Sequence, residues 1–294
     1  MGEQRERGLE HEPVMVDEVV RLLGGRGTVV DMTVGAGGHA QALLESGVAR
    51  VVGLDRDPEA IRIAAARLAR FGDRFSAVLT RFSDMPAVNR VDGVLYDLGV
   101  SAMQLERSER GFSYRQDGPL DMRMGGRGEE GTESAMELVN SGTEEELARV
   151  LFDYGEERRA RRVAAAIARA RARSPIRTTD ELARVVAGAV GRRRGGPHPA
   201  RRTFQALRIA VNRELEELAA SLPRAVGLLT PGGRVVAIAY HSLEDRIVKR
   251  FFVDEPRLMV LTKKPLRPSP EEVARNPRAR SARLRAVELI GEAA

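Results

Sequence analysis

Three aspartates each end an apolar, strand-like run in the first hundred residues. These residues are Asp31, Asp55 and Asp97, and segments with helical spacing separate the runs. Strands that alternate with helices predict a parallel sheet with helices on both faces. Because ligands bind at the carboxyl ends of the strands in open α/β sheets, we expect the three carboxylates to share one site.

A glycine-rich turn follows the first of these predicted strands. It contains Gly35, Gly37 and Gly38, and His39 comes next, where a helix is expected to begin. Glycine allows the backbone to approach a ligand closely, and the pattern also fits the dinucleotide fingerprint. A pyrophosphate at this turn would be repelled by Asp31. The sulfonium and ammonium groups of S-adenosylmethionine would instead be stabilised by acids.

The three aspartates together therefore favour a cationic cofactor over a dinucleotide. Any one of them alone is explained equally well as the cap of the following helix. Asp55 stands 20 residues after Gly35, where an acid accepts hydrogen bonds from both hydroxyls of a ribose. Both cofactors carry a ribose, so Asp55 by itself does not distinguish them.

The strand pattern stops near Gln104 and returns near Arg234. A Gly-rich charged loop and several helical patterns lie between, including a capping box at 178–181 and one long amphipathic helix over 204–222. Weaker strand patterns follow at 258–261 and 284–290. We predict an α/β core from residues 1–104 and 206–294, and an inserted helical domain, for substrate recognition, at residues 105–205.

The arginines are clustered in the predicted insertion. The chain has a net charge of +6, and residues 158–173 hold seven arginines and no acid. A second cluster without acids consists of Arg192, Arg193, Arg194, Arg201 and Arg202. Each cluster alone is typical of a solvated helix face, but two in one segment favour contact with phosphates. We expect the second cluster to bind RNA.

Composition excludes several kinds of chemistry. The chain has no cysteine, which rules out disulfides, thiolate metal sites and cysteine nucleophiles. Its four histidines lack ligand spacing, so no metal site is expected. No apolar run approaches the roughly 20 residues that span a bilayer, and the first ten residues are polar, so we expect a cytoplasmic protein.

Several long motifs resemble one family in order along almost the whole chain. They include His11-Glu12-Pro13-Val14-Met15, the segment 31–39, Asp97-Leu98-Gly99-Val100-Ser101, the segments 110–114 and 118–124, the segment 198–209, His241-Ser242-Leu243-Glu244-Asp245-Arg246 and the segment 276–281. These motifs are similar to those of the 16S ribosomal RNA cytosine-N4 methyltransferases (RsmH, formerly MraW). Small departures from the family pattern are Ala102-Met103 and Tyr240, which stands where Phe is common.

The resemblance implies a Rossmann-like class I core that uses S-adenosylmethionine, with an inserted helical domain. It implies methylation of the N4 amine of a decoding-centre cytidine in 16S ribosomal RNA, with the RNA inside the small subunit as partner. It also carries cofactor binding onto Gly37, Gly38, His39, Asp55, Phe82, Asp97 and Gln104, to which the residues themselves add Asp31 and Gly35.

The acceptor amine is a poor nucleophile, because its lone pair is delocalised into the base. Asp97 stands where DNA amino-methyltransferases often carry a Pro-Pro-aromatic motif, and we expect it to accept an N4–H hydrogen bond or to bind the cofactor. His241, Ser242 and Asp245 follow the last parallel strand and are candidates for the base pocket. Ser242 is explained equally well as a helix cap. A hydrolase triad is excluded, because no Gly-x-Ser-x-Gly elbow exists.

Rival interpretations remain open at this point. They are a methyltransferase for another RNA or DNA amine or for a small molecule, a non-catalytic RNA-binding factor in ribosome assembly, and an NAD-linked oxidoreductase. Methylation at C5 of a pyrimidine normally needs a cysteine nucleophile, so the composition favours an amine or hydroxyl target.

Overall fold

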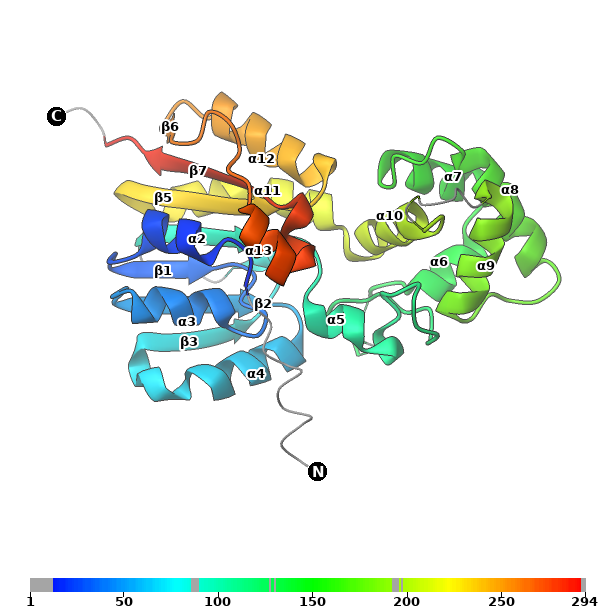
Figure 1. Ribbon diagram of the computed structural model, residues 1–294, viewed down its shortest axis with the longest axis horizontal. Coiled ribbons are helices and arrows are strands. Elements are labelled where there is room, and N and C mark those ends of the chain that lie inside the picture. The colour runs from blue at the N-terminus through cyan, green and yellow to red at the C-terminus, as the bar shows by residue number, and fades with distance from the viewer. Residues whose placement is uncertain are drawn as a thin grey trace. The chain divides into compact units, whose positions relative to one another are not determined.

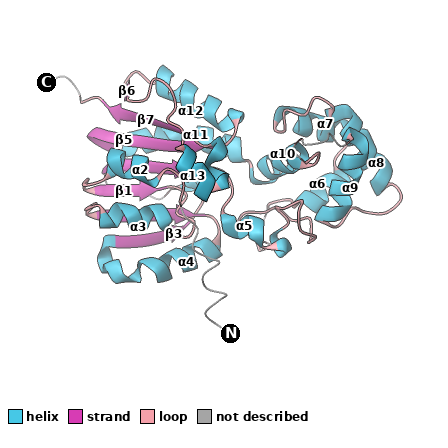
Figure 2. Ribbon diagram, in the orientation of Figure 1, coloured by secondary structure: helices cyan, strands magenta, loops and turns pink. Residues whose placement is uncertain are grey.

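A computed structural model describes residues 13–85, 90–126, 128–129, 131–191, 196 and 198–291, drawn in Figures 1 and 2. The chain divides into two compact units. Unit 1 consists of Met1–Gly99 and Leu215–Ala294, and unit 2 of Val100–Glu214.

Unit 1 is built on one seven-stranded sheet. Its strands are β1 (Thr28–Asp31), β2 (Arg50–Asp55), β3 (Phe75–Leu79), β4 (Val91–Asp97), β5 (Leu229–Ala239), β6 (Leu258–Val260) and β7 (Arg283–Leu289). The order is β3-β2-β1-β4-β5-β7-β6; β1 to β5 are parallel, and β7 runs antiparallel to both of its neighbours. The predicted α/β, Rossmann-like core is thereby confirmed.

Helices cover both faces of the sheet. One face packs against α2 (Val16–Leu23), α3 (Gly38–Glu45) and α4 (Pro58–Leu68), and the other against α11 (Glu214–Leu228) and α12 (Ser242–Asp254). Successive strand residues point to opposite faces, so Val29 lies in the first of these cores and Val30 in the second. This burial on two faces explains why five of the seven residues of β4 are buried, with no alternation between buried and exposed positions.

Shorter elements complete unit 1. They are α13 (Pro270–Arg275) and 3-10 turns at Ala69–Arg74, Phe82–Asp84 and Pro277–Ser281.

β5 pairs with β4 at Leu229 and again from Arg234, and the register shifts between these points. Gly232, with φ of 77°, lies in this interval and supplies the left-handed conformation that the turn requires.

Unit 2 is helical and has a hydrophobic core of its own. Its helices are α5 (Ala102–Glu106), α6 (Ala135–Ser141), α7 (Glu144–Asp153), α8 (Ala160–Arg171), α9 (Thr179–Val190) and α10 (Arg201–Asn212), with a 3-10 turn at Ser108–Arg110. The core includes Leu147, Val163, Leu182 and Leu207, all fully buried. Thr178 and Glu181 form the predicted capping box at the start of α9.

The predicted long helix over 204–222 is wrong, because α10 ends at Asn212 and α11 begins at Glu214. Arg213 between them has φ of 50°, in the left-handed region. The two halves also bury different faces: Phe204 and Leu207 enter the core of unit 2, whereas Leu218 and Leu222 enter that of unit 1. For this reason the units divide after residues 99 and 214, where the pattern suggested 104 and 205.

None of the helices formed by the described residues is long and apolar enough to cross a membrane.

Candidate cofactor and active site

The carboxyl ends of three adjacent strands each carry an aspartate, as predicted. Asp55, Asp31 and Asp97 are the last residues of β2, β1 and β4, which lie side by side in the sheet. The turn from β1 to α3 begins at the same edge. Residues of unit 1 that are far apart in sequence therefore meet where a ligand binds in this class of fold.

Backbone geometry explains the glycines of this turn. Gly35 and Gly37 have φ of 51° and 82°, which other residues rarely adopt. At Gly38 a side chain would come within 3.0 Å of Pro13, so this glycine lets the start of the described chain pack against the turn. Gly37 is the residue before α3, and no side chain caps that helix. Its first N–H groups are therefore available to a ligand.

Asp55 holds the turn in place with both carboxylate oxygens. Oδ2 accepts the backbone N–H of Gly35 at 3.0 Å, and Oδ1 accepts that of Asp57 at 2.9 Å. Burial raises the pKa of Asp55 to about 6 despite these hydrogen bonds. The backbone of Arg56 also donates to this carboxylate, and the lone pair that remains can accept a hydroxyl of a ribose.

Asp31 is only 1% exposed and is incompletely satisfied. Its Oδ1 accepts the backbone N–H of Thr33 at 3.1 Å, whereas Oδ2 is buried without a hydrogen-bond partner among the described residues. Burial raises the pKa of Asp31 to about 7, although the nearby His39 opposes this rise. A buried acceptor without a partner is expected where a ligand supplies the donor.

His39 and Tyr240 approach the two oxygens of Asp97 separately. Nε2 of His39 lies 3.4 Å from Oδ2, and the hydroxyl of Tyr240 donates to Oδ1 at 2.7 Å. The backbone N–H of Asp97 donates to Oγ1 of Thr33 at 2.7 Å, which ties the end of β4 to that of β1. These contacts orient the carboxylate.

The carboxylates also shift the titration of their two neighbours. Burial alone would lower the pKa of His39, but Asp97 and Asp31 outweigh it and raise that pKa. Burial and the charge of Asp97 raise the pKa of Tyr240 well above its ordinary value, so its hydroxyl remains a donor.

The whole edge is suited to a cation. Asp31, Asp55 and Asp97 bring three carboxyl groups to one turn, and two of them have pKa values raised by burial. The positive charge of an ammonium or sulfonium group would stabilise their charged forms, and an ammonium group would also supply a donor to Oδ2 of Asp31. The residues present therefore fit S-adenosylmethionine and do not fit a pyrophosphate.

Comparison with known proteins agrees with this geometry. Residues 8–290 match the model of the MraW methylase family. The chain belongs to this family. It is 46% identical to "Ribosomal RNA small subunit methyltransferase H" of Heliobacterium modesticaldum, over 95% of this chain and 98% of that protein. Proteins of the same name from Methylobacterium sp. and Sorangium cellulosum are each 50% identical, over 96% and 98% of this chain and 91% and 94% of theirs.

The MraW family motif at residues 241–246 follows β5, and its residues have two different structural roles in this chain. His241 is the residue before α12, and its Nδ1 accepts the N–H of Glu244 at 3.4 Å, while Glu244 accepts the N–H of Tyr240 at 2.8 Å. His241 therefore caps the helix, where the sequence suggested Ser242, which is the first helical residue.

Asp245 has a structural role that the sequence did not indicate. Its oxygens accept hydrogen bonds from Arg285 at 2.7 Å and Arg283 at 3.0 Å, both on β7. Burial would raise the pKa of Asp245, but the two guanidinium groups outweigh it and lower that pKa. The carboxylate therefore joins α12 to the sheet, and the role of Asp245 in the base pocket stays a prediction.

Phe82 and Gln104 lie in different units. Phe82 follows β3 in unit 1, and its ring meets that of Tyr96 edge to face at 6.0 Å. Gln104 belongs to unit 2, where its side chain accepts the N–H of Ser101 in the capping box of α5. Roles for both in cofactor binding stay predictions.

The arginines expected to bind RNA are only partly described. Arg201 and Arg202 are exposed at the start of α10, whereas Arg192, Arg193 and Arg194 lie outside the described residues. The adjoining motif packs inside unit 2, since the ring of His198 stacks on Tyr114 at 4.7 Å and Phe204 meets Tyr114 edge to face. This motif therefore supports the fold of unit 2 beside the exposed arginines.

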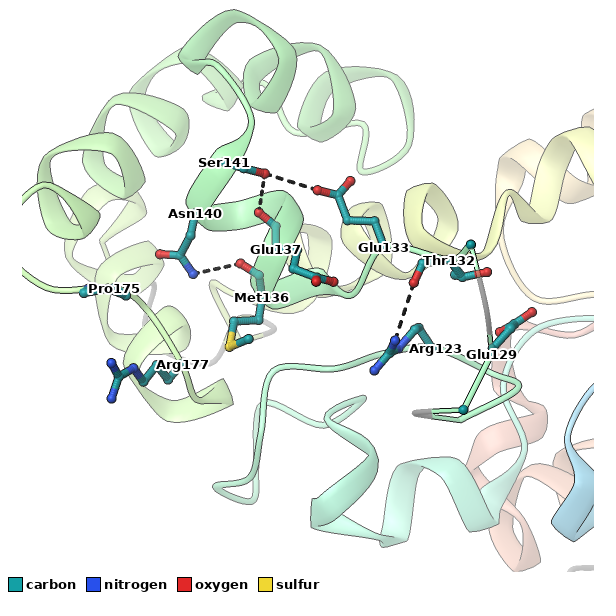
Figure 3. A pocket seen from close by; sticks show the side chains of 12 residues that line it. Arg123, Glu129, Thr132, Glu133, Met136, Glu137, Asn140, Ser141, Pro175 and Arg177 are labelled. Carbon is teal, nitrogen blue, oxygen red and sulfur yellow. Dashed lines mark hydrogen bonds between the residues drawn. The ribbon is translucent and has the colours of Figure 1, made fainter.

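A surface hollow lies in unit 2. Arg123, Met136, Asn140 and Arg177 line it together with several acids (Figure 3). Arg123 is held by a bidentate pair with Asp121, and the side chain of Asn140 bonds to the backbone. Its polar groups mostly stabilise the loops around α6, so we place the chemistry at the sheet edge and not here.

Proposed function

We propose that this protein transfers a methyl group from S-adenosylmethionine to the N4 amine of a decoding-centre cytidine in 16S ribosomal RNA. The observation that carries the proposal is the set of three carboxylates around the glycine turn, with a buried acceptor of Asp31 left for a cationic ligand. Membership of the MraW methylase family and the shared name of the relatives support the class of substrate.

The proposed cofactor contacts follow from the available lone pairs and N–H groups. When bound, S-adenosylmethionine supplies an electrophilic methyl group on a sulfonium. Asp31 would accept a hydrogen bond from its ammonium group, and Asp55 would accept the ribose hydroxyls. Gly35, Gly37 and Gly38 let the backbone approach, and His39, Phe82 and Gln104 complete the expected set.

Asp97 is proposed to orient the cytosine amine and to accept one of its hydrogen bonds. The nitrogen would become positive as it takes the methyl group from the sulfonium, whose sulfur is left as a neutral thioether, and the carboxylate of Asp97 would stabilise that charge and accept the proton that the nitrogen loses. The hydrogen bond from Tyr240 and the nearby His39 leave lone pairs on both oxygens of Asp97 for this task. His241 and Ser242 stay candidates for the wall of the base pocket.

Substrate recognition is assigned to the inserted helical domain, residues 105–205. Arg192, Arg193, Arg194, Arg201 and Arg202 would contact phosphates, and the RNA would be met within the small ribosomal subunit. A ribosomal substrate implies that the reaction takes place in the cytoplasm.

Nucleoside analysis tests the proposal. Methyl-labelled S-adenosylmethionine would be offered with the protein to small subunits from cells that lack the enzyme, to naked 16S RNA and to DNA. We expect label in N4-methylcytidine from ribosomal RNA alone. Label in 5-methylcytidine or in DNA would reject the assignment of the substrate, and binding of RNA without any transfer would indicate a non-catalytic assembly factor.

A further inference from the structure

The arginine-rich segment around α8 contains two kinds of arginine. Arg159 donates to the carbonyl oxygen of Val190, the last residue of α9, and Arg171 donates to that of Val139 in α6 at 2.7 Å. Carbonyl groups in the last turn of a helix have no partner inside the helix, so these two arginines complete the ends of neighbouring helices. The fold of unit 2 therefore accounts for Arg159 and Arg171.

The other five arginines have no such structural task. Arg158, Arg161, Arg162, Arg169 and Arg173 are all exposed, and none of the described residues offers them a hydrogen bond or an ion pair. No acid lies between residues 158 and 173 in the sequence. Their positive charges are therefore not neutralised by the segment that carries them.

The helix places these charges opposite its buried side. Ala160, Val163, Ala164 and Ile167 are the buried residues of α8, which packs against α7 and α9. At about 100° per residue, Arg162 and Arg169 fall on the opposite side of the helix, with Arg161 at the margin of the same face. Arg158 and Arg173 lie in the turns just before and after α8. We call these five residues the arginine stripe.

The N-terminal part of the stripe opposes the ordinary charge preferences of a helix. The N-terminus of α8 has no acid in its first turn and no side-chain cap, and three arginines of the stripe lie there, at the positive end of the dipole. At the other end, Arg169 lies in the last turn of α8, where positive charge is favourable, so the charges that the helix itself does not explain are those at the N-terminus. A pattern that breaks local rules without a compensating contact is expected at a functional surface.

We propose that the arginine stripe of α8 binds the phosphate backbone of the substrate RNA, in addition to the arginines near α10. The inference rests on the proposed function, because it takes the RNA as the anionic partner. Five exposed guanidinium groups on α8 and in its two flanking turns complement a polyanion, and phosphate contacts of this kind position RNA without reading its sequence.

A salt series with one variant tests the stripe. Arg158, Arg162 and Arg169 would be replaced together by Gln in the full chain, and binding to naked 16S RNA measured from 50 to 200 mM salt. Each lost phosphate contact removes about 0.7 from the slope of log K against log salt, so three remove about two units. The loss of affinity over this range should then be about 20-fold smaller than in the parent protein.

Two further variants make the result decisive. Replacing Arg62, Arg250 and Arg267, exposed arginines of unit 1, by Gln removes the same charge and should leave the slope nearly unchanged. Replacing Arg158, Arg162 and Arg169 by Lys keeps the charge and should retain the slope. An unaltered slope in the folded Gln variant of the stripe, or an equal fall in the unit 1 variant, would overturn the inference.

The outcome can be separated from that of the proposed function. RNA binding is measured without methyl transfer, whereas the product of the labelled reaction identifies the acceptor atom. If the parent protein forms N4-methylcytidine but the stripe variant keeps the parent's salt slope, only the inference about the stripe fails.

Discussion

At the scale of single residues, the site is dominated by carboxyl groups that are difficult to ionise without a ligand. Burial raises the pKa of Asp31 to about 7 from its ordinary value of 3.8. The folded chain thus binds more protons than the unfolded chain between these values, and the unliganded protein should lose stability as the pH rises through this window. A bound cation would favour the ionised carboxylate of Asp31 instead, since it stabilises that negative charge.

This reasoning predicts that cofactor affinity rises with pH. If binding requires ionised Asp31, affinity for S-adenosylmethionine should be about tenfold higher at pH 8 than at pH 6, and binding should release protons near pH 7. Loss of the proton of His39 would act in the same direction. Calorimetry in buffers of different ionisation enthalpy measures both quantities.

The control for this pH dependence is Asp31→Asn, which cannot titrate. Its affinity should be lower and should vary by only about twofold over the same range, through the carboxyl group of Asp55 with its pKa of about 6. A variant that retained the full tenfold change would remove Asp31 from the cofactor site.

Variants of Asp97 and Tyr240 distinguish orientation of the acceptor amine from binding of the cofactor. Asp97→Asn removes the charge that would stabilise the developing cation, so the single-turnover rate should fall by about 100-fold or more while affinity for the cofactor changes less. Tyr240→Phe removes one hydrogen bond and leaves the carboxylate, so the rate should fall by roughly tenfold at most.

Rates from single turnovers and affinities from calorimetry decide between these roles. Equal losses of rate and affinity in Asp97→Asn would assign that carboxylate to the cofactor alone. A larger loss in Tyr240→Phe than in Asp97→Asn would give the hydroxyl itself a task in the reaction.

The sequence was more informative about the carboxylates than about their partners. Asp31, Asp55 and Asp97 could be placed together because strand ends in a parallel sheet meet at one edge. Tyr240 and the two arginines that bind Asp245 could not, since they come from strands distant in sequence and their contacts depend on side-chain rotamers. Hydrophobic periodicity carries no information of this kind.

At the scale of elements, the junction between α10 and α11 decides where unit 2 ends. The apolar spacing continues across it, so periodicity predicted one helix. What interrupts the helix is local: Arg213 is left-handed, and Arg208 forms a bidentate pair with Glu214 at 2.7 and 2.8 Å around the corner. The preceding residue, Asn212, is 2% exposed and makes hydrogen bonds to a loop far away in the sequence.

Asn212 is predicted to be essential for the stability of unit 2. Its amide donates to the carbonyl oxygen of Met122 at 2.8 Å, and its oxygen accepts the N–H of Met124 at 2.8 Å. Met122 is itself buried with φ of 63°, a strained conformation that needs such support. Asn212→Ala leaves two buried backbone groups without partners and should cost about 2 to 4 kcal/mol in unfolding free energy.

Denaturant unfolding followed by a probe in unit 2 measures this cost. Asn212→Asp retains the acceptor for Met124 but buries a carboxyl group against the carbonyl oxygen of Met122, so its destabilisation should grow as the pH rises and that group must ionise, whereas that of the Ala variant should not. If Asn212→Ala unfolded at the same denaturant concentration as the parent protein, the hydrogen bonds could not be what fixes this loop.

At the scale of the whole molecule, the hydrophobic cores are divided between the units. One core consists of residues 112–211 in unit 2, and the other two, on the faces of the sheet, consist of residues of unit 1 alone. A chain of this kind need not unfold in a single transition. A ligand at the carboxylate edge should therefore stabilise the two units unequally.

Hydrogen exchange with and without S-adenosylhomocysteine tests this division. At a ligand concentration 100 times the Kd, a state that binds is stabilised by about 2.7 kcal/mol, so amides in β1, β2 and β4 should exchange about 100-fold more slowly. Amides in α7, α8 and α9 should change little, because their core contains no residue of the carboxylate edge. Equal protection of β4 and α7 would show that the units open together. Within unit 2, a gain of protection confined to α5 is the result expected if Gln104 contacts the cofactor, and its absence would remove Gln104 from the site.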